Sequence, residues 1–192
     1  AHVEQVKKIA RAGNYNALPF HRVIDDFMAQ GGEVAAVYML STPYPQLKAE
    51  FTFDRKPQER PAQWFGTTAE GEKLGYLDGF VVRSQPDDAA LLMESGAVKT
   101  WALHCPGVAS MARTNDPNSA DTQFFLMRQS NSNLDRAYTI WGRAVAGLDV
   151  IRGIKAGAPE NDGRLTAAAA DKLTRATVVA DLPAHRQPQV YV

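Results

Sequence analysis

Short runs in which apolar and polar residues alternate recur along the chain, and this period of two is typical of β-strands with one buried face. Turn-forming Gly, Pro, Asn and Asp residues separate many of these runs. The pattern therefore predicts a mainly β fold. The expected strands cover residues 20–24, 27–30, 46–53, 79–83, 98–104, 108–113, 123–127, 138–145 and 177–181.

Two segments carry helical spacing instead, with apolar residues three and four positions apart. The expected helices cover residues 2–12 and 148–155. The first of them places Val3, Val6 and Ile9 on one face, and Gly13 suits its C-terminal end. Helices that flank a series of strands in this way predict a β structure covered by a few helices.

The strands at 20–24 and 27–30 flank the polar pair Asp25-Asp26 and predict a β-hairpin. Each strand carries one polar side chain among large apolar ones, Arg22 in the first and Gln30 in the second. A fixed cation and an amide beside apolar groups suit a pocket that binds an apolar moiety next to a carbonyl. The alternative is a surface arginine that pairs with one of the neighbouring aspartates. A two-residue turn would place Gln30 on the face opposite Arg22, so a bulge or bend near Phe27 is expected.

The stretch from residue 54 to residue 106 carries its own structural signals. Two of the expected strands lie in it, and a helix is expected over residues 87–94. A structureless loop of this length is rare in a compact domain. Its apolar side chains, Trp101 among them, predict an ordered unit that packs on the rest of the structure.

Composition excludes several classes of function. The 192 residues have zero formal net charge and a pI of about 7.1, which gives no electrostatic basis for binding nucleic acid. No apolar run is long enough to span a membrane, and no signal peptide is visible. The four histidines lack zinc-site spacing and no phosphate-binding glycine loop is present, so no metal or cofactor is expected. The single Cys105 is expected to be a small core residue, and it does not decide the compartment.

Two motifs, FHRVIDDFMAQGG from Phe20 and SMARTNDPNSADTQFFL from Ser110, resemble the cyclophilin family of peptidyl-prolyl isomerases. The resemblance implies a closed antiparallel β-barrel capped by two helices. It further implies a single domain over residues 1–192, interrupted by an insertion at about 54–106. Cyclophilins begin with two strands ahead of the first helix. Here these strands are missing, so the sequence is expected to be a fragment or to receive them from elsewhere.

The resemblance also implies the activity, isomerisation of X–Pro peptide bonds during protein folding. The barrier to this reaction is amide resonance, about 18–20 kcal/mol. Twisting the bond returns a lone pair to the proline nitrogen, and a donor placed there stabilises the twisted state selectively. In this family the donor is an arginine, whose guanidinium is permanently charged and planar. The matching residue of this chain is Arg22.

The remaining site residues are implied residue by residue. The apolar cup for the proline ring matches Phe27, Met28, Phe125 and Leu134, and Tyr138 stands where many members have His. Gln30 matches the position that contacts the substrate carbonyl, while Ala112, Arg113 and Gln123 match positions that bind the preceding peptide. The sequence departs from the family at Thr122, which replaces Ser, at Arg113, which replaces Asn, and at Asn133, which replaces the Trp of cyclosporin-sensitive members.

The expected partners are Pro-containing peptides or unfolded protein clients, and cyclosporin binding is expected to be weak because Asn133 lacks an aromatic face. The rival interpretation is a non-catalytic module or chaperone that uses the same cleft to hold Pro-containing segments. A pure binder has no need of a transition-state donor. The presence of Arg22 together with the apolar cup therefore favours the enzyme.

Overall fold

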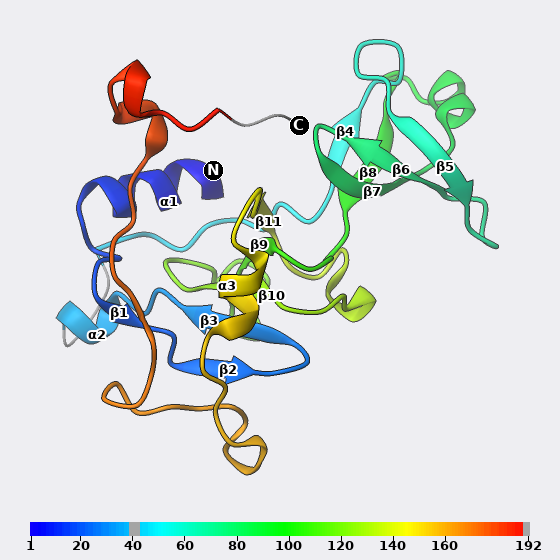
Figure 1. Ribbon diagram of the computed structural model, residues 1–192. Helices are drawn as coiled ribbons and strands as arrows, with labels where there is room; N and C mark the ends of the chain where they lie inside the picture. The colour runs from blue at the N-terminus through cyan, green and yellow to red at the C-terminus, as the bar shows by residue number, and fades with distance from the viewer. Residues whose placement is uncertain (39–42, 190–192) are drawn as a thin grey trace.

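The computed structural model describes residues 1–38 and 43–189, and two five-stranded antiparallel sheets dominate it (Figure 1). The first sheet has the order β11-β9-β10-β3-β2 and consists of β2 (Arg22–Ile24), β3 (Met28–Gly31), β9 (Val108–Met111), β10 (Phe124–Met127) and β11 (Ile140–Arg143). The second has the order β4-β8-β7-β6-β5 and consists of β4 (Phe53–Arg55), β5 (Gln63–Thr67), β6 (Lys73–Leu77), β7 (Phe80–Ser84) and β8 (Val98–Ala102). A two-stranded sheet pairs β1 (Leu18–Pro19) with β12 (Lys172–Leu173).

The helices are α1 (His2–Arg11), α2 (Ala35–Tyr38) and α3 (Leu148–Gly153), with short 3-10 helices η1 (Asp87–Leu92), η2 (Ser132–Leu134), η3 (Pro159–Asn161), η4 (Val179–Asp181) and η5 (Ala184–Arg186). None of the helices within the described ranges is long and apolar enough to cross a membrane. Both expected helices are present, as α1 and α3, but the expected helix over 87–94 is the 3-10 helix η1.

The mainly β prediction is confirmed, whereas over residues 1–38 and 43–189 the sheets do not close into the expected barrel. Strands β11 and β2 are the two edges of the first sheet and do not pair with each other. At the β2 edge an irregular loop takes the place of a further strand. The amide of Val23 donates to Gly163 O at 2.8 Å, and the amide of Leu165 donates to His21 O at 2.9 Å. The loop thus satisfies backbone groups that a sheet edge otherwise leaves open.

The core lies between α1 and the first sheet, and Phe124 of β10 is at its centre. The rings of Tyr15, Phe20 and Trp141 meet this phenyl ring edge-on, with centroids 5.4, 6.4 and 6.0 Å away. Edge-to-face packing of this kind adds about 0.5–1.5 kcal/mol per pair beyond area burial. It fixes β10, and with it the next residue along the strand, Phe125, which points to the opposite face.

Helix α1 buries Ile9 as predicted, but Val3 remains 41% exposed. Two polar residues, His2 and Gln5, are buried instead. The side-chain amide of Gln5 donates to the carbonyl oxygens of Pro45 and Asp121 at 3.0 and 2.6 Å. The spacing of apolar residues did not predict the burial of His2 and Gln5, because these side chains are buried through hydrogen bonds with backbone carbonyls rather than through apolar packing.

The β2–β3 hairpin departs from the expected two-residue turn. Arg22 pairs with Gln30 and Ile24 with Met28, so residues 25–27 form a three-residue turn. The amide of Phe27 donates to Ile24 O at 3.1 Å and closes it. One additional turn residue moves Gln30 onto the face of Arg22, because strand side chains alternate between faces. The longer turn makes the bulge expected near Phe27 unnecessary.

The predicted strands at 79–83 and 98–104 are confirmed as β7 and β8. Two other predictions are wrong. Residues 46–53 contribute only Phe53 to β4, and residues 177–181 contain the 3-10 helix η4 instead of a strand. Residues 46–53 alternate in polarity, but apart from a bridge between Leu47 and Ala120 only Phe53 pairs with a strand, and alternation alone cannot supply a partner.

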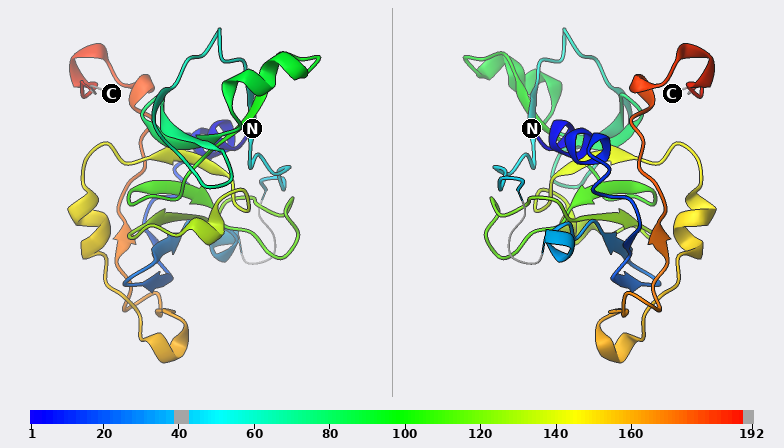
Figure 2. Two further views of the ribbon diagram at one scale, coloured as in Figure 1. Left: turned by 90° about the vertical axis from the view of Figure 1, so that its right-hand side faces the viewer. Right: turned by 90° about the vertical axis from the view of Figure 1, so that its left-hand side faces the viewer.

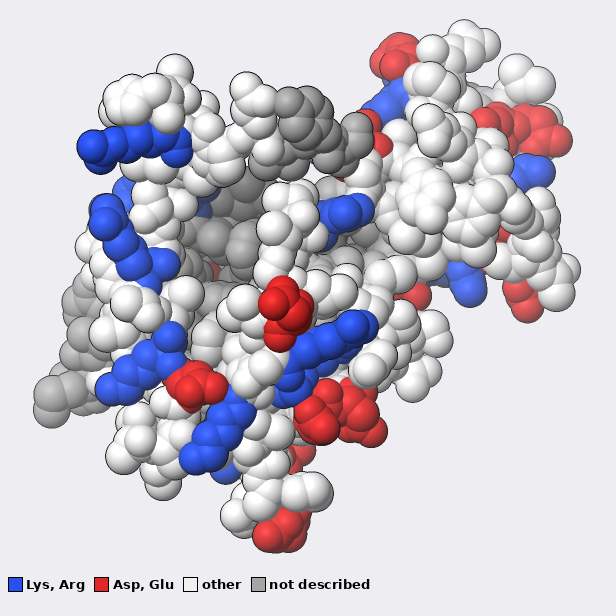
Figure 3. All heavy atoms as spheres, viewed as in Figure 1, with Lys and Arg blue, Asp and Glu red and all other residues white. Residues whose placement is uncertain are grey.

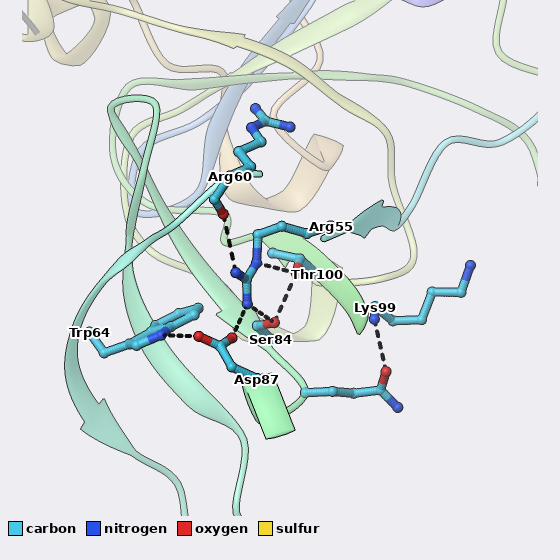
Figure 4. Close-up of polar contacts among 8 residues, drawn as sticks. Arg55, Arg60, Trp64, Ser84, Asp87, Lys99 and Thr100 are labelled. Carbon is cyan, nitrogen blue, oxygen red and sulfur yellow. Dashed lines mark hydrogen bonds and ion pairs between the residues drawn. The ribbon is translucent and has the colours of Figure 1, made fainter. Parts of the chain in front are cut away.

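A buried arginine organises the second sheet (Figure 4). The guanidinium of Arg55 pairs with the carboxylate of Asp87, which also accepts from Trp64 Nε1 at 3.2 Å. It donates further to Ser84 Oγ at 3.2 Å and Thr100 Oγ1 at 3.3 Å. Arg55 is 1% exposed while the side chain of Asp87 is 41% exposed, so charge-assisted bonds tie η1 to the sheet from the buried side.

The second sheet lies beside β11 in Figure 1 and at the upper end of the first sheet in both views of Figure 2. Residues 183–189 are exposed at the surface, and residues 190–192 lie outside the described ranges. On the face drawn in Figure 3, basic and acidic side chains intermingle without a field of one sign. This distribution agrees with the zero formal net charge.

Candidate active site

A pocket of about 230 Å³ opens on the first sheet at the β3–β10 pair, and it carries nine of the ten predicted site residues. Its floor consists of the apolar side chains of Met28 and Phe125, which are buried at 1% and 5% exposure. Antiparallel pairing of β10 with both β3 and β9 brings together residues from distant parts of the sequence. The lining residues are Arg22, Phe27, Met28, Gln30, Ala112, Arg113, Phe125, Leu134 and Tyr138.

Aromatic contacts hold Phe125 from two sides. Its ring meets Tyr138 edge-on at a centroid distance of 5.6 Å, and the imidazole of His104 stacks on it at 6.1 Å. A ring held in this way offers a fixed apolar wall to the pocket.

The support behind Phe125 is a buried polar network that sequence reasoning missed. His104 is 2% exposed, and its ring nitrogens lie 3.0 Å from Asp135 Oδ1 and 3.1 Å from Ser110 Oγ. The hydroxyl of Ser110 donates to Thr139 O at 2.9 Å. These partners come from three separate segments, so no local motif reveals them. The network fixes the imidazole against which Phe125 rests.

Arg22 projects from β2 to the rim of the pocket, and hydrogen bonds to Asp162 and Gln30 hold its guanidinium. Its Nε and Nη2 donate to the two carboxylate oxygens of Asp162 at 3.0 and 2.8 Å, and its Nη1 donates to Gln30 Oε1 at 3.5 Å. The alternative of a surface arginine that pairs with a neighbouring aspartate therefore named the wrong partner for Arg22. Arg22 pairs with Asp162, and Asp25 pairs with Arg128 instead. The paired guanidinium lowers the pKa of the Asp162 carboxyl, so this carboxyl is ionised at neutral pH.

Gln123 lies beside the pocket rather than in its lining. Its Oε1 accepts from Gln30 Nε2 at 2.9 Å, and it lines an adjoining polar pocket of about 280 Å³. The two pockets share Gln30, Ala112 and Arg113. A chain of side-chain contacts thus runs from Arg22 through both glutamines, and the two pockets adjoin each other.

The side chain of Arg113 makes its own contacts with aromatic rings and backbone carbonyls, in addition to the backbone contact expected from the sequence. Its guanidinium lies 4.4 Å from the ring centre of Tyr138 and 5.8 Å from that of Phe51. Its Nε donates to Ala137 O at 2.9 Å and its Nη1 to Thr114 O at 2.8 Å. Arg113 is therefore a fixed wall between the two pockets.

No residue of the pocket is prepared as a nucleophile or a proton shuttle. Burial lowers the pKa of the neighbouring His21 although Glu33 lies 3.9 Å away, and burial raises the pKa of the Cys105 thiol. Within the described ranges no three His, Cys, Asp or Glu side chains gather into a group that suits a metal ion. What the arrangement offers is an apolar cup next to a fixed cationic donor.

Comparisons with known proteins identify the class to which this arrangement belongs. The family model described as cyclophilin type peptidyl-prolyl cis-trans isomerase/CLD matches residues 1–178. The chain is 32% identical over 180 residues to a probable peptidyl-prolyl cis-trans isomerase of Brucella abortus, covering 94% of this chain and 72% of the relative. It is 29% identical to the peptidyl-prolyl cis-trans isomerase cyp18 of Streptomyces antibioticus, covering 80% and 69% of the two chains.

Among solved structures, the cyclophilin AquaCyp293 from Hirschia baltica superposes with a TM-score of 0.86 at 38% identity, covering 95% of this chain and 67% of that one. This chain therefore belongs to the cyclophilin-type peptidyl-prolyl cis-trans isomerases. Its activity is the cis–trans isomerisation of X–Pro peptide bonds, and the non-catalytic alternative is not favoured.

Proposed function

We propose that the pocket binds the X–Pro unit of an exposed peptide segment, with the proline ring on the Met28–Phe125 floor and Arg22 as the catalytic donor. The observation that carries the assignment is that a fixed guanidinium and this apolar floor line the same 230 Å³ pocket. A cup of this kind holds an apolar ring while the cation stands at its rim.

Catalysis in this assignment is electrostatic and steric. The proline ring stays in the cup while the carbonyl of the preceding residue rotates about the C–N bond. Rotation breaks amide resonance and leaves a lone pair on the proline nitrogen, which accepts a hydrogen bond from the guanidinium of Arg22. This bond is available only to the twisted state, so it lowers the barrier without stabilising either planar isomer. No covalent intermediate forms and no proton is transferred.

The peptide on the N-terminal side of the proline runs toward the adjoining polar pocket. Gln30 is placed to donate to the substrate carbonyl, while Ala112, Arg113 and Gln123 bind the preceding residues. The support for this direction is that three of these four residues line both pockets and that Gln123 holds Gln30. The clients are Pro-containing peptides and unfolded chains with exposed X–Pro bonds.

The second sheet is an insertion, at about residues 54–106, in a single domain of this family. None of its strands contributes a residue to the lining of the 230 Å³ pocket. The sheet is therefore separable in role from the isomerase site.

Arg22→Ala tests the donor assignment. Loss of a transition-state hydrogen bond is expected to lower kcat/KM by about tenfold or more, because each factor of ten corresponds to about 1.4 kcal/mol. The assay couples isomerisation of a short X–Pro peptide to proteolysis of the trans form. The matched control is Arg11→Ala, which removes another arginine paired in the same way with an aspartate, Asp181, but far from the pocket. Equal activity of Arg22→Ala and wild type, with unchanged circular dichroism, excludes Arg22 as the donor.

Cyclosporin is expected to inhibit weakly, because Asn133 is exposed and does not line the pocket. The buried area lost with an indole corresponds to about 1.5–3 kcal/mol of affinity, roughly ten- to a hundredfold. Asn133→Trp is expected to strengthen inhibition in the same peptide assay while changing turnover little. Nanomolar inhibition of the wild type would contradict this expectation.

A further inference from the structure

We infer that Asp162 is a positioning residue, which holds the guanidinium of Arg22 so that its Nη1 edge is presented to the peptide pocket. The inference rests on the proposed function, in which Arg22 is the donor. It concerns a residue outside both sequence motifs and outside the pocket lining.

The donors of Arg22 show how the orientation is set. A guanidinium has five N–H groups in a rigid plane. The carboxylate of Asp162 accepts from Nε at 3.0 Å and from Nη2 at 2.8 Å, a bidentate contact that fixes the plane in two directions. The backbone oxygen of Asp162 also accepts from Nε, at 3.2 Å. The remaining edge carries Nη1, which reaches Gln30 Oε1 at 3.5 Å. A donor held only weakly by the protein is the one available to a substrate.

Exposure distinguishes the two ends of the pair. The side chain of Arg22 is 22% exposed and lines the pocket, whereas that of Asp162 is 59% exposed and does not. The carboxylate therefore approaches from the solvent side. An exposed ion pair contributes little to stability, so the value of this contact lies in its geometry rather than in folding energy.

The backbone that carries Asp162 is itself fixed against β2. Asp162 has a φ of +54° and the following Gly163 a φ of +69°, both in the left-handed region. A Cβ at Gly163 would lie 2.5 Å from Val23 O, and the carbonyl of Gly163 accepts from the amide of Val23 at 2.8 Å. The loop therefore rests directly on the strand that carries Arg22, and the two residues keep one relative position.

The sequence contains a signal for the turn but not for its partner. Asn161-Asp162-Gly163 is a turn sequence, because Asn, Asp and Gly tolerate left-handed backbone conformations. Asp162 lies 140 residues from Arg22 in the chain, so only the folded structure connects them.

Two substitutions separate orientation from charge without straining the loop. Asp162→Gly removes the carboxylate, and Asp162→Asn keeps one acceptor oxygen but removes the charge; both residues suit a left-handed φ. Asp162→Gly is expected to lower kcat about tenfold with KM within about twofold, because a mobile donor is rarely in place when the bond twists. Asp162→Asn is expected to lose about threefold, since one of the two bonds survives.

The matched control is Asp181→Asn. Asp181 binds Arg11 through the same two atoms, Nε and Nη2, at 2.7 and 2.8 Å on a surface remote from the pocket. Its substitution is expected to leave kcat and KM unchanged. Nitrogen-15 NMR supplies a readout independent of activity: the Nη2–H resonances of Arg22, whose acceptor is the carboxylate alone, are expected to lose their protection from exchange in Asp162→Gly and to keep it in the control.

The outcomes are distinguishable from those of the donor test. If Arg22→Ala loses activity while Asp162→Gly retains wild-type kcat, the donor assignment holds and the positioning role is overturned. A higher kcat in Asp162→Gly than in wild type also overturns the positioning role. It would mean that the carboxylate only weakens the electrostatic effect of the Arg22 cation on the substrate. If Arg22→Ala is as active as wild type, the proposed function fails first. A loss in kcat, graded from Gly to Asn, together with the NMR change, supports the inference.

Discussion

At the scale of single residues, Arg113 shows how one substitution relative to the family adds structure to a pocket. Its guanidinium lies against Tyr138 and Phe51 and donates to two carbonyl oxygens, so it forms a wall between the two pockets. The backbone contact expected from the sequence does not require this side chain. A cation over a tyrosine ring contributes about 0.5–1 kcal/mol at a partly exposed site.

Arg113→Ala is expected to raise KM about three- to tenfold and to change kcat by less than about twofold, because it loosens Tyr138 without touching the donor. The peptide assay at several substrate concentrations separates the two constants. Arg136→Ala is a matched control, since Arg136 lies 4.9 Å over the ring of Trp101, outside the pocket. A fall in kcat with constant KM would instead assign Arg113 to the chemical step.

His21, next to Arg22, carries a pH dependence of stability. Burial lowers its pKa from the usual 6.5 in the folded state, despite the opposing effect of Glu33. Between the two pKa values the unfolded chain binds a proton that the folded chain does not. Stability is therefore complete above about pH 6.5 and is lost as pH falls toward the folded-state pKa.

Urea unfolding at pH 7.5 and pH 5.5 tests this sign. Wild type is expected to lose up to about 1 kcal/mol more than His21→Gln over this interval. His185→Gln provides the matched variant on the exposed tail and is expected to follow wild type. Equal losses in wild type and His21→Gln would mean that the imidazole is protonated as readily in the fold as outside it.

At the scale of elements, the β2–β3 hairpin marks the limit of sequence reasoning. Its existence and the residues of its strands follow from alternation and the polar pair. Its register does not, because the choice between a two- and a three-residue turn depends on contacts outside the hairpin. Arg128 is one such contact: it is 4% exposed and binds Asp25 in the turn and Ile154 O beyond α3.

In the candidate site, the residues that line the pocket could be predicted from the sequence, whereas the residues that support them could not. Nine of the ten residues predicted from the resemblance line one pocket, and seven of these nine belong to the two motifs. The residues that hold them in place, His104 behind Phe125 and Asp162 beside Arg22, were not predicted. Side-chain networks join segments that are far apart in sequence, and neither period nor propensity carries this information.

At the scale of the whole molecule, the second five-stranded sheet meets the first at β11. Arg143 of β11 donates to Gly79 O, and Ile140 borders a cavity of about 170 Å³ with Phe80 and Val82. The buried cluster around Arg55 belongs entirely to the second sheet and η1. Parts of one protein can open with different free energies, so the two sheets need not open together.

Arg55→Ala tests whether the sheets open separately, because it leaves Asp87, Ser84 and Thr100 without their common donor. Arg55 is buried but the side chain of Asp87 is 41% exposed, so the cost is that of losing a buried donor, about 1–3 kcal/mol. Amides of β7 and β8 are therefore expected to exchange about five- to a hundredfold faster. Amides of β3 and β10 are expected to keep their protection, and kcat/KM is expected to stay within about twofold. Arg60→Ala is the matched control, since Arg60 pairs with Asp78 on the exposed surface of the same sheet, where an ion pair contributes about 0–1 kcal/mol.

Hydrogen exchange followed by mass spectrometry resolves the two sheets in one experiment, and the peptide assay on the same samples reports the pocket. Uniformly faster exchange in both sheets, with a parallel fall in activity, would show that the protein unfolds as one cooperative unit. In that case the 103–107 link between β8 and β9 couples the sheets more strongly than their contacts indicate. Exchange that is faster in β7 and β8 alone, with activity retained, would place the isomerase pocket on a unit whose stability does not depend on the second sheet.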